Sequence, residues 1–597
     1  MIRYAVASWD PAQADAGRRV RSFEARILAS QANARSIVRK PGWSVMTWGD
    51  AVGMTRLVGG DGVIVGRIFG ALGSEGTDVL ACRSLANASD FRTICQLLSE
   101  RCWGAYVWLW ADPASQAAFV FRDPIGTLDC VSWEDEGVRV TTSDARTCVQ
   151  AQRSSNIGID WDEVGNVLVD PATMVDTSLL TGVVSIAAGE AVEFQQRSAR
   201  RTSFWNAAAF AKRRSVTAPP ASAIRDTVQA CMAHWPADVA KIGCEISGGL
   251  DSAIVAATLA QGQSMIAGYH YFTRDAVGDE RYYARSVAHH IGVALVETVM
   301  PVRALSHDDL LDLPVGNRPS IGAVSLFHDR DLAARARDAG VTTLFTGQGG
   351  DAVFFQHAAI EIAGDCQGTW RQQVGQLAAL SQWTGQSFWS ALIRRLVQYR
   401  RRDGEVAPPS FLLRTTNRTP RSPAWVGDIN GLSPAKRLHV EALFRSRLAF
   451  GASWTSEAMD VVHPLLSQPI VEAVLALPVM ALTEGFRDRG LARRAFAPDL
   501  PAAVVNRYGK GALTPYFGHC LARSLPFLRE FLLGGKLAEH DVLARDRLDA
   551  ALDVDYLMQN DIYPELIWLV LTEHWARGWE GTLMSSRGGL DGLDGMT

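Results

Sequence analysis

The chain has 597 residues, of which 48% are hydrophobic and 20% are charged, and its formal net charge is −4. This is the composition of an ordinary globular protein of two or more domains, and the charge gives no general reason to bind nucleic acid or an anionic membrane. Nine cysteines occur without a Cys-x-x-Cys pair, so neither a disulfide framework nor a zinc site is predicted. The N-terminus lacks the apolar run of a signal peptide and no stretch is long enough to span a bilayer, so we expect a cytoplasmic protein.

The first third of the chain has the pattern of a β-rich domain. Short apolar runs at residues 62–66, 105–110 and 117–121 are separated by Gly, Asp and Pro, and residues 181–194 form another strand–turn–strand pattern. We therefore predict a β-rich domain over residues 1–205.

Beyond this boundary, helical and strand patterns alternate. Apolar strand patterns at 264–272 and 341–346 accompany a helical pattern at 279–291, and such alternation is typical of a parallel α/β sheet. We predict one α/β domain with helical additions over residues 206–580. Residues 581–597 are rich in Gly and Ser, which predicts a flexible tail.

A glycine turn follows the first strand of this second domain. Residues 242–246 alternate as a strand does, Ser247-Gly-Gly249 carries no bulky side chain, and an apolar helix pattern begins at Leu250. Together these elements form an anion site, because unpaired amides and the helix dipole point at the ligand. A carboxylate beside phosphates, that of Asp251, implies a cation such as Mg²⁺. The predicted phosphate-binding residues are Ser247, Gly248, Gly249, Leu250, Asp251 and Ser252.

A glycine-rich turn that binds no ligand is the alternative interpretation of this pattern. The sequence Gly588-Gly-Leu-Asp-Gly592 nearly repeats it, but no strand precedes that copy and no apolar helix follows it. The copy at Ser247 has both, which favours a nucleotide site there.

A second glycine turn, Thr346-Gly-Gln-Gly-Gly-Asp351, follows the strand pattern at 341–346. Carboxyl ends of parallel strands share one edge of a sheet, so Asp251 and Asp351 could share Mg²⁺ and the pyrophosphate of ATP. Thr346 and Gly347 are predicted to line the same site. Either aspartate alone could be a turn residue or a helix cap, whereas the pair favours a ligand role.

Ser247–Ser252 and Thr346–Asp351 together resemble the synthetase domain of the asparagine synthetase family. The resemblance implies an enzyme that cleaves ATP to AMP and pyrophosphate and activates a carboxylate as an acyl-adenylate. Arg122–Gly126 and Gly182–Phe194 are similar to segments of the family's N-terminal amidotransferase domain. The implied fold is a β-rich sandwich of the Ntn-hydrolase type, followed by an ATP-pyrophosphatase α/β domain with a parallel sheet.

The segment Arg507-Tyr-Gly-Lys-Gly511 is similar to a segment late in the family's synthetase domain. The resemblance implies that Lys510 acts in catalysis beside Asp251 and Asp351, by neutralising charge on the phosphates as the adenylate forms and breaks down. The family's Arg-x-Lys spacing is Arg-x-x-Lys here. A solvated loop lysine is the alternative.

Two departures from the family pattern bear on the reaction. Glutamine-using members need a cysteine at position 2, where this chain has Ile2. An aliphatic side chain cannot attack an amide, so we expect no glutaminase activity and a structural or docking role for the N-terminal domain. Gln348 and Ala352 stand where the family has glutamates, so the groups around an attacking ammonia are altered.

Relatives without a working glutaminase include lasso peptide cyclases and β-lactam synthetases, whose substrates carry their own amine. We expect a lasso peptide cyclase, which adenylates an Asp or Glu side chain of a precursor peptide and closes a macrolactam with the peptide's N-terminal amine. The implied cofactors are ATP and Mg²⁺, and the implied partners are the precursor peptide and a leader peptidase. A β-lactam synthetase or another small-molecule amide ligase is the first alternative, and an ammonia-dependent asparagine synthetase is the second. A non-catalytic scaffold that binds ATP or a peptide is an alternative of a different class.

Overall fold

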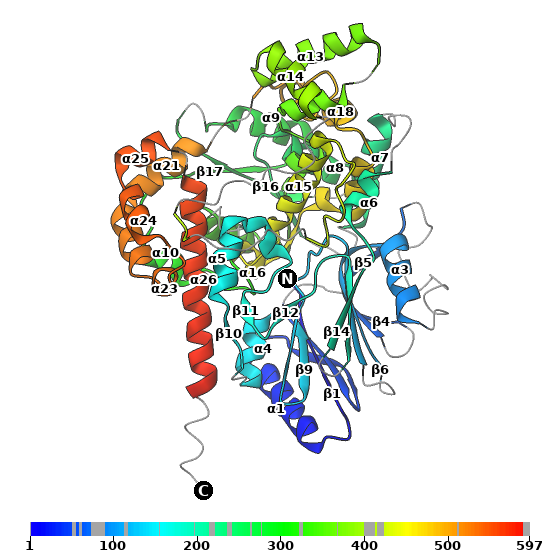
Figure 1. Cartoon of the computed structure of the whole chain (residues 1–597), viewed down its shortest axis with the longest axis vertical. Helices are drawn as coiled ribbons and strands as arrows, with labels where there is room; N and C mark the ends of the chain where they lie inside the picture. Colours follow the sequence, from blue (N-terminus) through cyan, green and yellow to red (C-terminus); the bar gives the residue numbers. More distant parts are fainter. Residues whose placement is uncertain are drawn as a thin grey trace.

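Figure 1 shows the computed structural model of the chain, with the N-terminal sheets at the lower right and the parallel sheet above them. The structure describes residues 2–49, 55–58, 62–72, 90–112, 117–153, 156–195, 198–213, 221–235, 241–262, 265–275, 278–320, 326–366, 368–398, 412–414, 423–509, 511, 513–560 and 562–588.

The N-terminal domain is a sandwich of two antiparallel sheets. The first has the order β12-β8-β9-β1-β3-β2, with β1 (Arg3–Trp9), β2 (Arg35–Lys40), β3 (Trp43–Trp48), β8 (Val131–Asp135), β9 (Val138–Thr142) and β12 (Val184–Ser185). The second has the order β14-β13-β7-β6-β5-β4, with β4 (Thr55–Val58), β5 (Gly62–Gly70), β6 (Cys102–Asp112), β7 (Ala117–Arg122), β13 (Glu190–Gln195) and β14 (Ser198–Ser203).

Alternate side chains of the two sheets meet in one apolar layer. Tyr4 and Val45 from the first sheet pack with Val65, Val107 and Val192 from the second, and all five are buried. Alternation along each strand sends these side chains to the same face, which is the arrangement of a β-sandwich. The predicted β-rich sandwich is confirmed.

The C-terminal domain is built on a parallel sheet of order β17-β16-β15-β18-β19, with β15 (Ile242–Glu245), β16 (Met265–Phe272), β17 (Leu295–Val299), β18 (Thr343–Phe345) and β19 (Asp460–Val462). The predicted parallel α/β fold is therefore confirmed. Strand order reverses between β15 and β18, and in open parallel sheets ligands bind beyond the carboxyl ends of the strands at such a switch point. The two glycine turns begin at the carboxyl ends of β15 and β18, at this switch point.

Helices cover the sheet and extend beyond it. The helix after β15, α8 (Leu250–Gly262), is buried over its first ten residues, which explains why it is apolar all round. The helices α9 (Arg281–Ile291) and α11 (Asp329–Asp338) follow β16 and precede β18, and α13 (Trp370–Thr384) and α14 (Phe388–Gln398) project at the top of Figure 1. Within the described residues, no helix has the length and apolarity needed to cross a bilayer.

The prediction of a flexible tail is wrong for residues 581–588, which are helical. The last helix, α26 (Tyr563–Gly588), includes residues 581–588, while residues 589–597 lie outside the described part. Leu583 is buried, and the Arg146 guanidinium donates to Thr582 Oγ1 at 2.7 Å from α4 (Ala145–Gln152) of the N-terminal domain. Tertiary packing therefore continues the helix where composition alone indicates a tail.

A buried ion pair joins the two domains. Arg447 of the C-terminal domain donates to both carboxylate oxygens of Asp176 at 2.9 and 2.8 Å and to the carbonyl of Ile125 at 2.8 Å. The Arg447 side chain is 2% exposed. Burial alone would raise the pKa of Asp176, but Arg447 and the nearby Arg122 hold it below its ordinary value. Asp176 therefore stays ionised at neutral pH, and the pair fixes how the domains dock.

Replacing Arg447 by Met should lower the free energy of unfolding by about 3–5 kcal/mol, because it leaves Asp176 buried without its main partner. The first unfolding transition in urea measures this. The pKa of Asp176 is depressed in the folded protein, so the ion pair's contribution to the free energy of unfolding is lost as the pH falls through that pKa. The difference in unfolding free energy between Arg447→Met and the wild type should therefore become smaller in acid. The control is Arg445→Met, which breaks the half-exposed interdomain pair with Asp170 (3.0 Å) and should cost less than about 1 kcal/mol. Equal losses in both variants would contradict this account.

Candidate nucleotide site

Two serines fix the shape of the first glycine turn. The Ser247 N–H donates to Ser252 Oγ at 3.2 Å, the two hydroxyls lie 2.9 Å apart, and the Gly249 N–H donates to Ser247 Oγ at 3.3 Å. Leu250 is buried as the first residue of α8. The turn is thus held directly over the N-terminus of α8, where backbone amides and the helix dipole favour an anion.

The second glycine turn packs directly against the first. A Cβ added at Gly347 would overlap backbone atoms of Ser252, and one at Gly350 would overlap the side chain of Asp251. The two turns can approach this closely only because neither glycine has a side chain. The structure thus brings Ser247–Ser252 and Thr346–Asp351 into a single site, although their phosphate-binding role remains a prediction.

A single guanidinium group joins the two predicted metal ligands. Arg489 Nη1 donates to Asp251 Oδ2 at 2.6 Å and to Asp351 Oδ1 at 2.8 Å. The side chains of Asp251 and Arg489 are 9% and 4% exposed, whereas that of Asp351 is 48% exposed. Asp351 therefore marks the side from which a ligand can reach the pair. Burial would lower the pKa of Arg489, but the two carboxylates hold it above its ordinary value, so the group stays charged.

The second turn is also tied to the neighbouring strand β19. The Thr346 N–H donates to the carbonyl of Val462 at 3.1 Å, and Thr346 Oγ1 lies 2.7 Å from His463 Nδ1. The same hydroxyl accepts from the Gln348 N–H at 3.1 Å. Burial lowers the pKa of His463 to about 4, so the imidazole is neutral at ordinary pH. Gln348 thus belongs to the turn's own hydrogen-bond framework through its backbone.

The late segment predicted to carry the catalytic lysine borders the first turn. Arg507 Nη1 donates to the carbonyl of Gly248 at 3.1 Å and its guanidinium forms an ion pair with Glu280, which also accepts from the Gly511 N–H at 2.7 Å. Lys510 lies outside the described residues. Arg507 and Gly511 lie beside the first turn, and the role of Lys510 remains a prediction.

The residues present fit Mg²⁺ with ATP. Asp251 and Asp351 supply oxygen ligands at one place, and Mg²⁺ in nucleotide sites is held by one or two carboxylates together with substrate phosphates. In the described part of the chain, no group of three or more His, Cys, Asp or Glu side chains could hold a metal. The metal would therefore depend on the nucleotide for its remaining ligands. It would supply positive charge to the phosphates.

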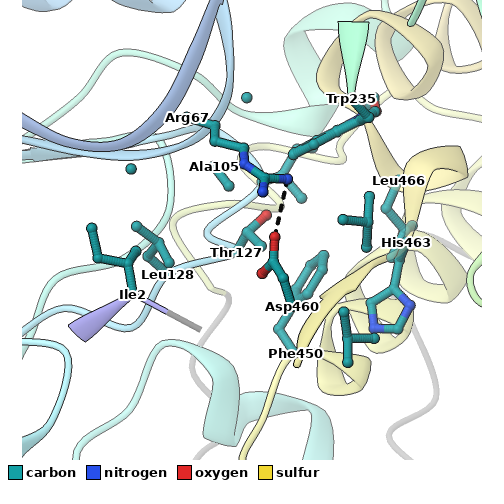
Figure 2. Close-up of a pocket in the computed structure, with 16 residues that line it drawn as sticks. Ile2, Arg67, Ala105, Thr127, Leu128, Trp235, Phe450, Asp460, His463 and Leu466 are labelled. Atoms are coloured by element: carbon teal, nitrogen blue, oxygen red, sulfur yellow. Dashed lines mark hydrogen bonds and ion pairs between the residues drawn. The ribbon is translucent and has the colours of Figure 1, made fainter. Parts of the chain in front are cut away.

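A pocket lies where the two domains meet (Figure 2). Ile2 and Leu128 line it from the N-terminal domain, and Phe450 and Leu466 line it from the C-terminal domain. Ile2 is 7% exposed and presents only an aliphatic side chain to the pocket. Ile2 itself therefore offers no side-chain nucleophile here.

Comparison with known proteins assigns the family. The model of the asparagine synthase family matches residues 221–577, more than half of the chain. The chain belongs to the asparagine synthase family. The microcin J25-processing protein McjC of Escherichia coli is 21% identical over 254 residues, which are 42% of this chain and 44% of McjC. The chain thus spans less than half the length of this relative.

Two solved structures share a weaker likeness with this family member. A glutamine phosphoribosylpyrophosphate amidotransferase from B. subtilis is 12% identical, with a TM-score of 0.22, over 58% of this chain and 82% of its own. A structure described as the allosteric regulatory enzyme of purine biosynthesis is 12% identical, with a TM-score of 0.21, over 68% of this chain and 93% of its own. At these scores neither supports a statement about this chain.

Arg489 is a residue of the site that the sequence patterns do not predict. It lies 238 and 138 residues from the two aspartates that it joins, and it stands outside both glycine turns. Its backbone is left-handed (φ 53°), and its N–H donates to the carbonyl of Phe355, which is also left-handed (φ 59°). Non-glycine residues adopt this conformation at a cost of about 1–2 kcal/mol each. A strained pair at the site therefore supports a functional constraint that residue patterns do not reveal.

Replacing Gly347 by Ala should push the two turns apart and weaken the binding of Mg·ATP by roughly a hundredfold, since a 1 Å misplacement at a site can have an effect of this size. Isothermal titration with an ATP analogue that is not cleaved measures the affinity. Gly262→Ala is the control, because a Cβ at that position meets nothing within 4 Å. Unchanged affinity in Gly347→Ala would show that close contact between the turns is not required.

Proposed function

We propose that the chain is an ATP-dependent carbon–nitrogen ligase that forms AMP and closes a macrolactam in a precursor peptide. The observation that carries the proposal is the joined pair of glycine turns, with Asp251 and Asp351 on one cation, in a member of the asparagine synthase family. Such a site suits the binding of a triphosphate and the separation of pyrophosphate from it.

In the proposed reaction, an oxygen of the substrate's Asp or Glu side chain attacks the α-phosphorus of ATP. The bond from that phosphorus to the β-phosphate oxygen breaks, and pyrophosphate leaves. Asp251 and Asp351 would hold Mg²⁺ against the phosphates, and Arg489 and Lys510 would stabilise the charge that moves onto pyrophosphate. Because Arg489 already contacts both aspartates, it would turn from them toward the phosphates as the nucleotide binds.

The N-terminal amine of the same peptide then attacks the acyl carbon, and AMP leaves as the amide forms. The amine loses a proton in this step. Holding amine and adenylate together can supply on the order of 7–11 kcal/mol through proximity. Ile2 supports an amine carried by the substrate, because the chain lacks the cysteine that releases ammonia from glutamine.

A peptide substrate is favoured by the likeness to a microcin-processing protein, which is 21% identical. Gln348 and Ala352, which replace the family's glutamates, support a changed amine acceptor. We also propose a leader peptidase as a partner, since the precursor's amine must be released before the ring can close. A small-molecule amide ligase such as a β-lactam synthetase remains the first alternative.

ATP–pyrophosphate exchange with synthetic peptides tests the proposal. Peptides that carry Asp or Glu at different distances from the N-terminus should support exchange and yield a product lighter by one water. Asp251→Asn and Asp351→Asn should each lower exchange by roughly a hundredfold or more. Asp226→Asn, the same change at an exposed position on α7 (Ala221–His234), is the control and should retain activity.

Three results would contradict the proposal. Exchange with small amino acids but with no peptide would favour the small-molecule ligase. Formation of asparagine from aspartate and ammonia would favour the ammonia-dependent synthetase. Peptide binding that is unaffected by Asp251→Asn, without exchange for any substrate, would favour a scaffold.

A further inference from the structure

An ion pair between the domains crosses the pocket of Figure 2. Arg67 Nη1 on β5 lies 3.0 Å from Asp460 Oδ2, at the start of β19. The two side chains are 12% and 19% exposed, and their surroundings include the apolar side chains of Ile125, Leu128 and Phe450. In such surroundings a carboxylate without a cationic partner is costly, so the ion pair with Arg67 holds the Asp460 side chain in place.

The backbone around Arg67 is shaped to aim this side chain. Gly104 of β6 lies opposite Ile68 in the strand register and has a positive φ of 136°. A Cβ there would overlap the carbonyl oxygen of Arg67. Glycine in a strand interior often marks a close approach of two backbones. Here it lets β6 approach β5 at the residue that reaches the other domain.

From Asp460, short contacts lead directly to the second glycine turn. Asp460, Val461 and Val462 of β19 pair in parallel with Thr343, Leu344 and Phe345 of β18. At the end of this ladder, Val462 O accepts from the Thr346 N–H at 3.1 Å, and His463 Nδ1 lies 2.7 Å from Thr346 Oγ1. Gly347 is the next residue, and it packs on Ser252 of the first turn. β19 is an edge strand of three residues that pairs with β18 on one side, and the register of so short an edge strand is weakly specified by pairing alone.

We propose that Arg67 is a positioning residue, through which the N-terminal domain holds the second glycine turn in the conformation that binds ATP. Domain docking does not need this pair, because Arg447 with Asp176 and Arg318 with Asp129 already join the domains. The N-terminal domain, which has no nucleophile at Ile2, would thereby act in the synthetase reaction by positioning this turn. The inference depends on the proposed function only for its ATP-binding readout.

Hydrogen–deuterium exchange of the full chain without nucleotide tests the inference directly. Arg67→Met should speed exchange in a peptide that covers residues 343–351 by roughly tenfold, because opening of the turn no longer requires breaking the ion pair. Asp460→Asn should have a similar effect, and the double variant should be little worse than either single one, since both remove the same interaction. Arg67→Lys should retain part of the protection.

The matched control is Arg445→Met, which breaks another interdomain ion pair without contact to the turn. It should leave exchange over residues 343–351 unchanged. Titration with an uncleaved ATP analogue is the second readout, and Arg67→Met should bind it about tenfold more weakly, within the range typical of coupling between sites.

Several outcomes would overturn the inference. Exchange over residues 343–351 that is the same in Arg67→Met and wild type is one, and an equal increase in the Arg445→Met control is another. Full exchange of this peptide in the wild type at the first time point would also show that the turn is not held. If instead the exchange result holds but no substrate supports pyrophosphate exchange, the proposed reaction fails and the positioning role stands.

Discussion

The candidate nucleotide site depends on two carboxylates that share one cation. Asp251 follows strand β15 and Asp351 follows the neighbouring strand β18. Because their glycine turns pack against each other, both carboxylates lie within hydrogen-bond distance of Arg489. Two negative charges this close repel strongly unless a positive charge lies between them. The buried guanidinium of Arg489 donates a hydrogen bond to each carboxylate. In the proposed function, a metal–nucleotide complex would bring its own positive charge to the two carboxylates, and Arg489 would turn to the phosphates.

The residues that shape the site all hold the two glycine turns in close contact. Gly347 and Gly350 allow contact, the serines at 247 and 252 fix the first turn, and β19 fixes the second through Thr346. The left-handed backbone of Arg489 adds strain that its ion pairs must offset. A site assembled from four separate chain segments can be precise only if the sheet and the domain interface are rigid, which is the role of the buried Arg447–Asp176 pair.

Local patterns predicted those parts of the site that are contiguous in sequence. A strand, a glycine turn and a helix within about a dozen residues have one physical meaning wherever they occur, so the first turn, the second turn and the two aspartates could be placed at one sheet edge in advance. The helical conformation of residues 581–588 could not be predicted in this way. Residues 581–588 are poor in strong helix signals, and they continue the helix where Leu583 is buried and Thr582 accepts a hydrogen bond from Arg146 of the N-terminal domain.

The sequence by itself determined which chemical groups are available: two glycine turns, the two carboxylates that end them and an aliphatic side chain at Ile2. Those properties belong to the side chains and backbone of short segments. Only the tertiary structure decided that Arg489 is the cation between the aspartates and that Arg67 reaches Asp460 across the domain interface. Both depend on residues far apart in the chain, and charged side chains outside a motif carry no sign of which partner the fold will bring to them.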